Sequence, residues 1–96
     1  IIEWACPAYA SGDNETQLYN ATTGASAAVG MSVWADSSGS GGSAVVPGKT
    51  VQTLTDSTTF EIQHRSTSSV SHGFGNANDL GGICVYTQVM ITKIAD

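Results

Sequence analysis

Apolar and polar positions alternate in the C-terminal third of the chain in a pattern that predicts two β-strands. In residues 58–65, Phe60, Ile62 and His64 fall on one side and polar residues on the other, which is the period of a strand with one buried face. Residues 83–94 are apolar and β-branched on both sides, as in a central strand covered on both faces. Because so small a domain has few layers of its own, we expect a partner subunit to supply the second cover.

Shorter apolar runs separated by turn residues predict the other strands. We expect strands at residues 1–9, 16–20 and 28–34, and a further strand of residues 45–46 and 50–56 that is broken around Pro47 and Gly48. Pro7 lacks a backbone donor and should lie at an edge, a bulge or a strand end. Turns are expected at residues 10–15 and 21–25, and an exposed Gly/Ser-rich loop at residues 36–43. No segment has a helical period, so we predict an all-β, antiparallel sandwich or barrel that forms a single domain over residues 1–96.

Charge is scarce in this chain and negative on balance. Only 11% of the 96 residues are charged and the formal net charge is −5, whereas about a quarter of the residues of a typical soluble domain are charged. This composition is typical of all-β extracellular or virion surfaces and of subunits that bury much of their surface. The three cations form no basic stripe, which argues against nucleic-acid binding. No apolar run approaches the roughly 20 residues of a membrane span, so we expect no membrane insertion.

Two further features bear on the origin of the chain and on its location. Ile1 begins within an apolar strand without a preceding Met, so we expect the chain to be the C-terminal part of a longer one. The two cysteines, Cys6 and Cys84, could form one intramolecular disulfide, because antiparallel first and last strands would bring them together. The alternative is two small thiols of the kind that are common in protein cores.

Five segments in sequence order resemble the C-terminal domains of phage tail-fibre and related virion proteins. They are IIEWACPAY, TQLYN, TTFEIQHRS, HGFGNANDLGG and VYTQVMITKI, and together they cover nearly the whole chain. The resemblance implies a trimeric jelly roll of the tumour-necrosis-factor and complement globular-head type. In that fold the first and last strands seen here are neighbours in the inner sheet, which faces the threefold axis. Two or three further strands normally precede this region in the family. The two cysteines and the loop at residues 36–43 depart from its pattern.

The function implied by the resemblance is that of a non-enzymatic knob at the distal end of a virion fibre. Such a homotrimer would contact other virion proteins and bind a glycan or protein of the host surface through its loops. The candidate ligand contacts are Trp34, Ser38, Ser40, His72, Phe74 and Asn76. The candidate trimer contacts are Trp4, His64, Tyr86, Gln88 and Met90. Alternatives are a capsid decoration or cement protein, a purely structural trimerisation cap, and the head of a bacterial surface adhesin.

Signals for catalysis or for a metal site are weak. Residues 30–34 begin like a nucleophile elbow but lack its closing glycine, and the acidic residues are spread singly along the chain. His64 has no ligand at metal-binding spacing and is expected to be a partly buried residue that is hydrogen-bonded across the sheet or the trimer axis. Asn76, Asn78 and Asp79 offer oxygens that could hold calcium, but these residue types are ordinary turn formers. We therefore expect no enzyme activity, no metal and no cofactor.

Overall fold

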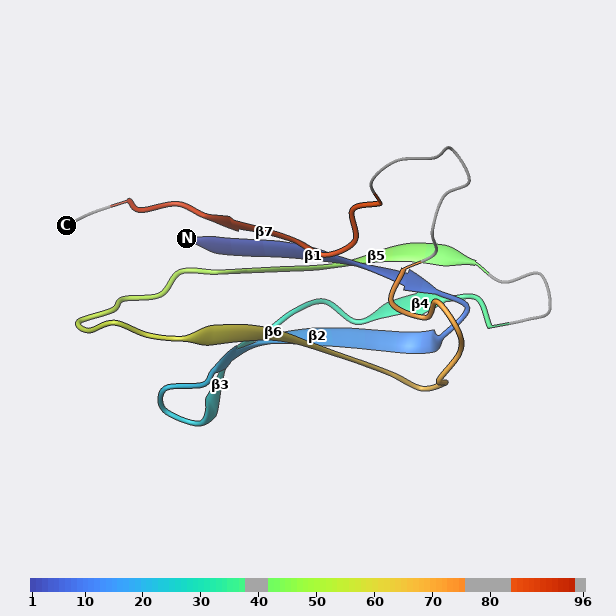
Figure 1. Ribbon diagram of the computed structural model, residues 1–96, viewed down its shortest axis with the longest axis horizontal. Coiled ribbons are helices and arrows are strands. Elements are labelled where there is room, and N and C mark those ends of the chain that lie inside the picture. Colours follow the sequence, from blue (N-terminus) through green and yellow to red (C-terminus); the bar gives the residue numbers. More distant parts are fainter. Residues whose placement is uncertain (38–41, 76–83, 95–96) are drawn as a thin grey trace.

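The computed structural model describes residues 1–37, 42–75 and 84–94, and its regular structure is entirely β (Figure 1). It measures about 48 × 30 × 18 Å. The strands are β1 (Ile2–Tyr9), β2 (Gly12–Asn20), β3 (Ala25–Val29), β4 (Val33–Ala35), β5 (Ser43–Thr50), β6 (Phe60–Ser66) and β7 (Gln88–Ile91). The predicted all-β class is thereby confirmed.

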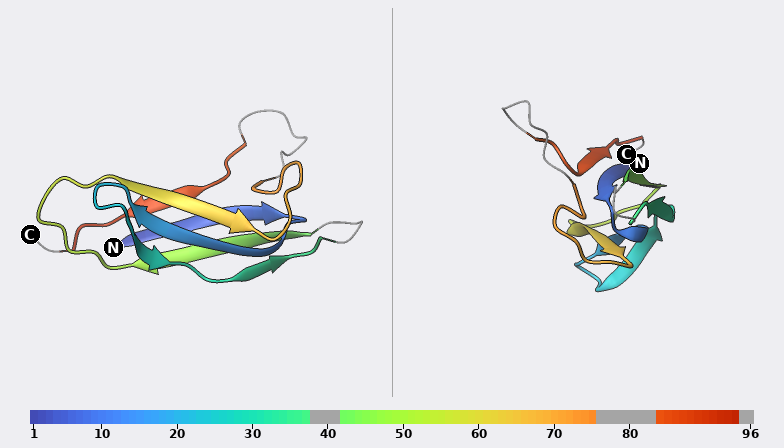
Figure 2. Two further views of the ribbon diagram at one scale, coloured as in Figure 1. Left: turned by 90° about the horizontal axis from the view of Figure 1, so that it is seen from below. Right: turned by 90° about the vertical axis from the view of Figure 1, so that its right-hand side faces the viewer.

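The strands form two antiparallel sheets that lie face to face (Figures 1 and 2). The β1 sheet has the order β5-β1-β7. In the β2 sheet, β6 pairs with one edge of β2, while β3 and β4 share the other edge. This sharing follows from the register, because Asn14 pairs with both Val33 and Ser66, and Gln17 pairs with both Val29 and Gln63. The arrangement is compatible with the antiparallel sandwich that the strand pattern predicts.

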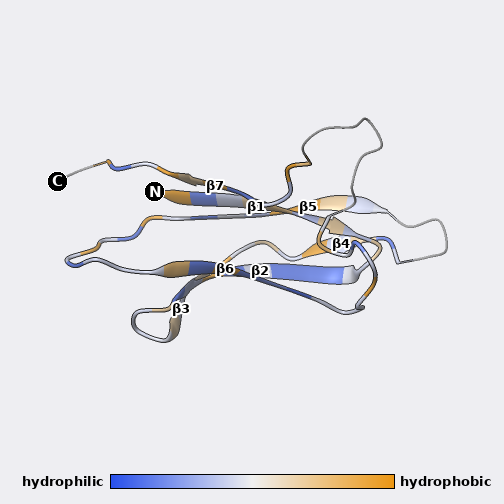
Figure 3. Ribbon diagram, in the orientation of Figure 1, coloured by the Kyte–Doolittle hydropathy of each residue, from blue (hydrophilic) through white to orange (hydrophobic). Residues whose placement is uncertain are grey.

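The core lies between the sheets and is formed by the alternate residues of β1 and β2. Along β1 every second residue is buried, which matches the alternation expected from the sequence. Strand β2 alternates in the same way, with Leu18 on its inner face. The buried apolar residues are Ile2, Trp4, Cys6, Ala8, Leu18, Ala35 and Val46. Colouring by hydropathy shows that β2 is mostly hydrophilic along its length (Figure 3).

Trp4 joins the two sheets at the centre of this core. Its indole Nε1 donates a 2.7 Å hydrogen bond to Oγ1 of Thr16 on β2. The indole ring covers Gly48 on β5, where any Cβ atom would overlap it. Gly30 lies equally close, since a Cβ there would come within 2.7 Å of the Thr16 hydroxyl and of the Pro47 carbonyl. The two glycines therefore make room for the Trp4–Thr16 contact.

The expected strand at residues 28–34 is interrupted, which corrects the prediction. Its two halves are β3 and β4, and residues 30–32 between them belong to neither strand. There the Gly30 amide donates to the Thr16 carbonyl at 2.8 Å and the Met31 amide donates to the Pro47 carbonyl at 3.0 Å. These two bonds reach one strand of each sheet, so the interruption ties the sheets together.

Strand β2 is longer than expected, because residues 12–15 were predicted as part of a turn. Its first half is polar, yet Asn14 is buried and fully engaged. The Asn14 Oδ1 atom accepts from Ser11 Oγ at 3.0 Å, and its Nδ2 atom donates to the Gly12 carbonyl at 2.8 Å. A buried polar group is tolerated when it is hydrogen-bonded in this way.

Strand β5 runs without a break through Pro47, where a break was predicted. It lies at the edge of its sheet, with β1 as its partner, and Pro47 pairs with Ala5. The Pro47 carbonyl points away from β1, as its bond to Met31 shows. Proline is accommodated at such a position because no ladder donor is needed there. The predicted continuation at residues 51–56 is exposed and forms no strand.

The last strand pairs antiparallel with β1, as the resemblance implied. It is shorter than the expected 83–94, and it lies at the edge of its sheet rather than in the centre. All four of its residues are exposed. The described part of the chain therefore does not cover β7 on both faces.

Replacing Thr16 by Val should destabilise the fold. The change keeps the shape of the side chain but leaves the buried Trp4 N–H without its acceptor, which costs about 1–3 kcal/mol. Urea unfolding followed by far-UV circular dichroism measures the change, and Thr53→Val at an exposed position is the matched control. Equal stability of the two variants would show that the inter-sheet hydrogen bond contributes nothing.

Candidate functional site

A pocket at one end of the sandwich contains two of the predicted ligand contacts, His72 and Phe74. It lies where the segment after β6 folds back, which is coloured orange in Figure 1. Its volume is about 410 Å³. It is lined by Ser66, Ser68, Ser69, Val70, His72, Gly73, Phe74, Gly75 and Tyr86.

Backbone hydrogen bonds hold the segment that forms this pocket. The Gly73 amide donates to the Val70 carbonyl at 3.1 Å, and the Gly75 amide donates to the His72 carbonyl at 3.0 Å. The Gly73 carbonyl accepts from the Tyr9 amide at 2.8 Å, which fixes the segment to the end of β1. Gly75 has a φ of 144°, and a side chain there would overlap the Tyr86 ring. Glycine is therefore needed for the approach of Tyr86.

Phe74 stacks on His64, which lies on the inner side of β6. The two ring centroids are 4.1 Å apart and the planes are inclined by 29°. His64 Nε2 lies 2.8 Å from Asn14 Oδ1, so this nitrogen carries the proton and donates to the amide oxygen. Burial lowers the pKa of His64 below its ordinary value. The expectation of a partly buried His64, hydrogen-bonded across the sheet, is confirmed.

The groups that line the pocket can form hydrogen bonds and stack on a ligand. Serine hydroxyls and the Tyr86 phenol supply polar groups, and Phe74, which is 52% exposed, supplies an aromatic face. The pKa of Tyr86 is raised by loss of hydration and by the neighbouring Cys84, so the phenol remains a donor at neutral pH. Among the described residues, none of those that line the pocket carries a carboxylate. Among residues 1–37, 42–75 and 84–94, no three His, Cys, Asp or Glu side chains are grouped to hold a metal ion.

The predicted ligand contacts do not all meet at this pocket. His72 and Phe74 both line it. Trp34 lies on β4, 59% exposed, and faces away from the core on the β2 sheet. Ser38, Ser40 and Asn76 lie outside the described residues, as do Asn78 and Asp79. Ser66, Ser68 and Ser69 lie within residues 66–78, which the sequence predicts as a binding loop, although they are not among its individually predicted contacts.

The predicted trimer contacts fall into two groups. Trp4 is 3% exposed and is bonded to Thr16 inside the core, whereas His64 is partly buried and is bonded to Asn14. A trimer contact by either residue stays a prediction. Gln88 and Met90 pair with Ala5 and Glu3 on the outer face of the β1 sheet and are exposed. Tyr86 is 42% exposed and also lines the end pocket.

The cysteines are both free thiols in this structure, and of the two only Cys6 is buried as the core-thiol alternative expects. Cys6 is buried on the inner face of β1, and burial raises its pKa despite a hydrogen bond with Thr87. Such a thiol is unreactive at neutral pH. Cys84 precedes Gln88, the first residue of β7 that pairs with β1, and is only partly buried.

Comparisons with protein-family models, with curated proteins and with solved structures find no match. A search of the described residues for a long apolar helix able to cross a membrane also finds none.

The lowered pKa of His64 predicts a pH-dependent stability. The folded state binds a proton at His64 less readily than the unfolded chain, whose ordinary value is 6.5. The contribution of His64 is therefore complete above pH 6.5 and decreases as the pH falls through 6.5 towards the lowered pKa. The free energy of unfolding, measured from about pH 7.5 to about pH 5, should fall less in His64→Gln than in the native protein. His72→Gln is the matched control. If the loss of unfolding free energy at low pH is reduced in His72→Gln and not in His64→Gln, the assignment to His64 is contradicted.

Proposed function

We propose that this chain is a non-enzymatic knob domain of a virion surface protein, at the distal end of a phage tail fibre. In this proposal three copies associate as a jelly-roll homotrimer, and the end pocket contacts a host-surface glycan or protein. The exposed apolar C-terminal segment is the observation that carries it. The resemblance of the five sequence segments supplies the biological setting.

That C-terminal segment presents apolar side chains on both faces of a sheet edge. Ile91 is 73% exposed and Met90 61% exposed, although they point to opposite sides of β7. Its exposed large apolar residues are Val85, Tyr86, Val89, Met90, Ile91 and Ile94. Edge strands of soluble monomers are normally short, charged or covered, and burying one such side chain contributes about 1.5–3 kcal/mol. Burial of this segment against partner copies would account for its apolar side chains.

The strand order supports a jelly roll. Strand β7 lies beside β1, as the resemblance requires of the first and last strands. Strands β3 and β4 contact β5, which closes one side of the sandwich. On the other side, among the described strands, β6 pairs with β2 alone and β7 with β1 alone. The further strands implied by the resemblance would add at these two edges.

A purely structural trimerisation cap is the second candidate. The exposed β7 favours it as much as it favours a receptor-binding knob, because both need the same interface. The two candidates differ in the end pocket, which a structural cap does not use.

Replacing Met90 by Lys should break the assembly. A lysine in an apolar interface must be desolvated without a partner, which is costly. Light scattering on the eluting protein should give three times the 9.8 kDa chain mass for the native chain and a smaller mass for Met90→Lys. Met31→Lys is the matched control, because Met31 is 67% exposed but lies between β3 and β4. A native protein that elutes at 9.8 kDa would remove the trimer from the proposal.

Replacing His72 or Phe74 by Ala should slow adsorption of the virion to its host while the assembly survives. Loss of one good contact in each of three copies lowers the avidity more than the single-site affinity. Adsorption is measured as the decline of free infectious particles with time, and native mass verifies assembly. Thr55→Ala, on an exposed segment away from the pocket, is the control. Unchanged adsorption, with fibres or capsids that fall apart when the domain is deleted, would favour the structural cap.

A further inference from the structure

The segments that follow β5 and β7 continue past the first residue of the central strand between them. Strand β1 has β5 on one side and β7 on the other. After both of these strands the chain runs on past the N-terminus, on either side of it (Figures 1 and 2). Exposure keeps alternating after β5, since Val51 and Thr53 are exposed and Gln52 between them is partly buried. Residues 51–54 and 92–94 thus continue the outer strands with no central strand between them. We call these two segments the open ladder.

The register of β5 shows which of its backbone groups face the open ladder. In an antiparallel sheet, a residue turns its N–H and C=O to one neighbouring strand, and the next residue turns them to the other. The Pro47 carbonyl accepts from Met31 and so points away from β1. Continuing this alternation places the N–H and C=O groups of Gln52 and Leu54 on the side of β1, beyond its first residue.

The same alternation applies on the side of β7. The Thr92 amide donates to the Ile1 carbonyl at 2.8 Å, and the Ile1 amino group donates to the Thr92 carbonyl at 2.7 Å. Two residues further along, Ile94 turns its N–H and C=O groups to the line of β1 as well. An amide at Ile1 would form the same bond as the amino group, so the ladder can continue upstream without rearrangement.

These backbone groups have no partner within the described residues. Gln52, Leu54 and Ile94 form no backbone hydrogen bond there. Backbone donors and acceptors of strands are normally paired, and unpaired sheet edges are normally short, charged or covered. Two of the three residues instead expose large apolar side chains, since Leu54 is 50% exposed and Ile94 is 61% exposed. The open ladder therefore has the properties of a site for one more strand.

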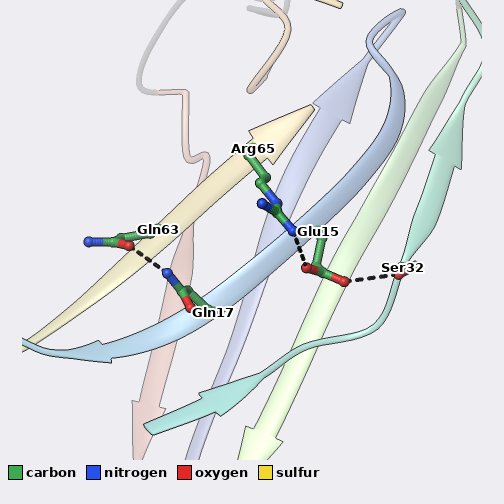
Figure 4. Close-up of polar contacts among 5 residues, drawn as sticks. All are labelled: Glu15, Gln17, Ser32, Gln63 and Arg65. Atoms are coloured by element: carbon green, nitrogen blue, oxygen red, sulfur yellow. Dashed lines mark hydrogen bonds and ion pairs between the residues drawn. The ribbon is translucent and has the colours of Figure 1, made fainter. Parts of the chain in front are cut away.

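The exposed polar groups of the β2 sheet, in contrast, bond to one another (Figure 4). Glu15 accepts from Arg65 Nη2 and from Ser32 Oγ, both at 3.2 Å. Gln17 Nε2 donates to Gln63 Oε1 at 2.7 Å. A ligand on that face would have to compete with these bonds. A strand in the open ladder would form its hydrogen bonds without breaking any that the described residues make.

We propose that the open ladder holds an extended segment directly upstream of Ile1, which lengthens β1 by about three residues in the complete protein. A strand that enters in the direction of β1 ends at the Ile1 nitrogen. A strand from another molecule would meet the charged amino group there, whereas a covalent continuation replaces this charge by an amide. The inference builds on the expectation that the chain is part of a longer one, and it is independent of host binding and of the trimer.

The alternation of β1 predicts how the upstream side chains point. Ile2 and Trp4 face the core, so the first and third residues before Ile1 face it too, and the second faces outward. By continuation of the register the third lies opposite Leu54, which an apolar side chain would cover. The upstream chain then leaves at the end of the sandwich opposite the end pocket, because the pocket segment is bonded to Tyr9. Only the consequence for a fibre, that the pocket points away from the shaft, rests on the proposed function.

Short N-terminal extensions of the 96-residue chain test the open ladder. The probe is the tripeptide Val-Thr-Val placed directly before Ile1, with its valines at the two inward positions. The matched control is Val-Pro-Val, which keeps both valines. Its proline lacks the N–H that would donate to the Ile94 carbonyl, and proline is not tolerated inside a central strand. Amide hydrogen exchange followed by nuclear magnetic resonance compares both with the chain that has no extension.

The Val-Thr-Val extension should slow exchange of the Gln52, Leu54 and Ile94 amides by about tenfold, the effect of one net hydrogen bond each. The Thr53 amide faces away from β1 and should exchange at an unchanged rate. With Val-Pro-Val the Ile94 amide should exchange as fast as in the chain without an extension. The midpoint of urea unfolding should rise with Val-Thr-Val and not with Val-Pro-Val.

Three outcomes would overturn the inference. Exchange and the urea midpoint could be the same with Val-Thr-Val as without it. Val-Pro-Val could protect the Ile94 amide as well as Val-Thr-Val does. Protection could also be present without any extension and increase with protein concentration, which would show that a second copy fills the open ladder. Native mass and virion adsorption are measured separately, so the trimer and host binding can fail while the ladder is protected, and the reverse.

Discussion

The hydrogen bond from the Trp4 indole to Thr16 is the contact on which the rest of the structure depends. It connects the central strands of the two sheets inside the core. To make it, the indole must lie flat over β5, which requires glycine at position 48, and the next chain segment must pass close to Thr16, which requires glycine at position 30. The interruption between β3 and β4 is therefore a consequence of the core and not of a weak strand.

The two long sides of the sandwich differ in how well they are closed. Where β5 meets β3 and β4, the sheets are joined through Gly30 and Met31. On the opposite side the edges are β6 and β7. Residues 73 and 74, after β6, cover one end of this side through the Phe74–His64 stack and the Gly73–Tyr9 bond. The exposed apolar residues of β7 lie on this less covered side. Because exposed apolar patches usually mark interaction sites, self-association is the simplest explanation for them.

Much of the fold could be predicted from the sequence because its signals are local. Alternation in β1 and β6 is a property of the segments themselves, and both strands form almost as expected. The errors arose where a distant group decides the outcome. Asn14 belongs to a strand because His64 and Ser11 satisfy its amide oxygen, and Pro47 is tolerated because β5 has an outward edge. The end pocket was half predicted for the same reason: His72 and Phe74 adjoin a glycine turn, whereas Tyr86 comes from a segment beyond it in sequence.

Assembly and recognition meet at Tyr86 in this arrangement, because this residue lines the end pocket and also belongs to the exposed C-terminal segment. The other residues that line the pocket lie between positions 66 and 75, after β6 of the β2 sheet, whereas β7 and the outer face of the β1 sheet would be covered in the proposed trimer. A pocket open to solvent at the end of a sandwich buries little of a ligand and binds it weakly. Three such pockets, held in fixed relation by the assembly, would act together on a surface that displays many copies of one ligand. Weak single sites are therefore no argument against a role in adhesion, provided that the interface through β7 forms.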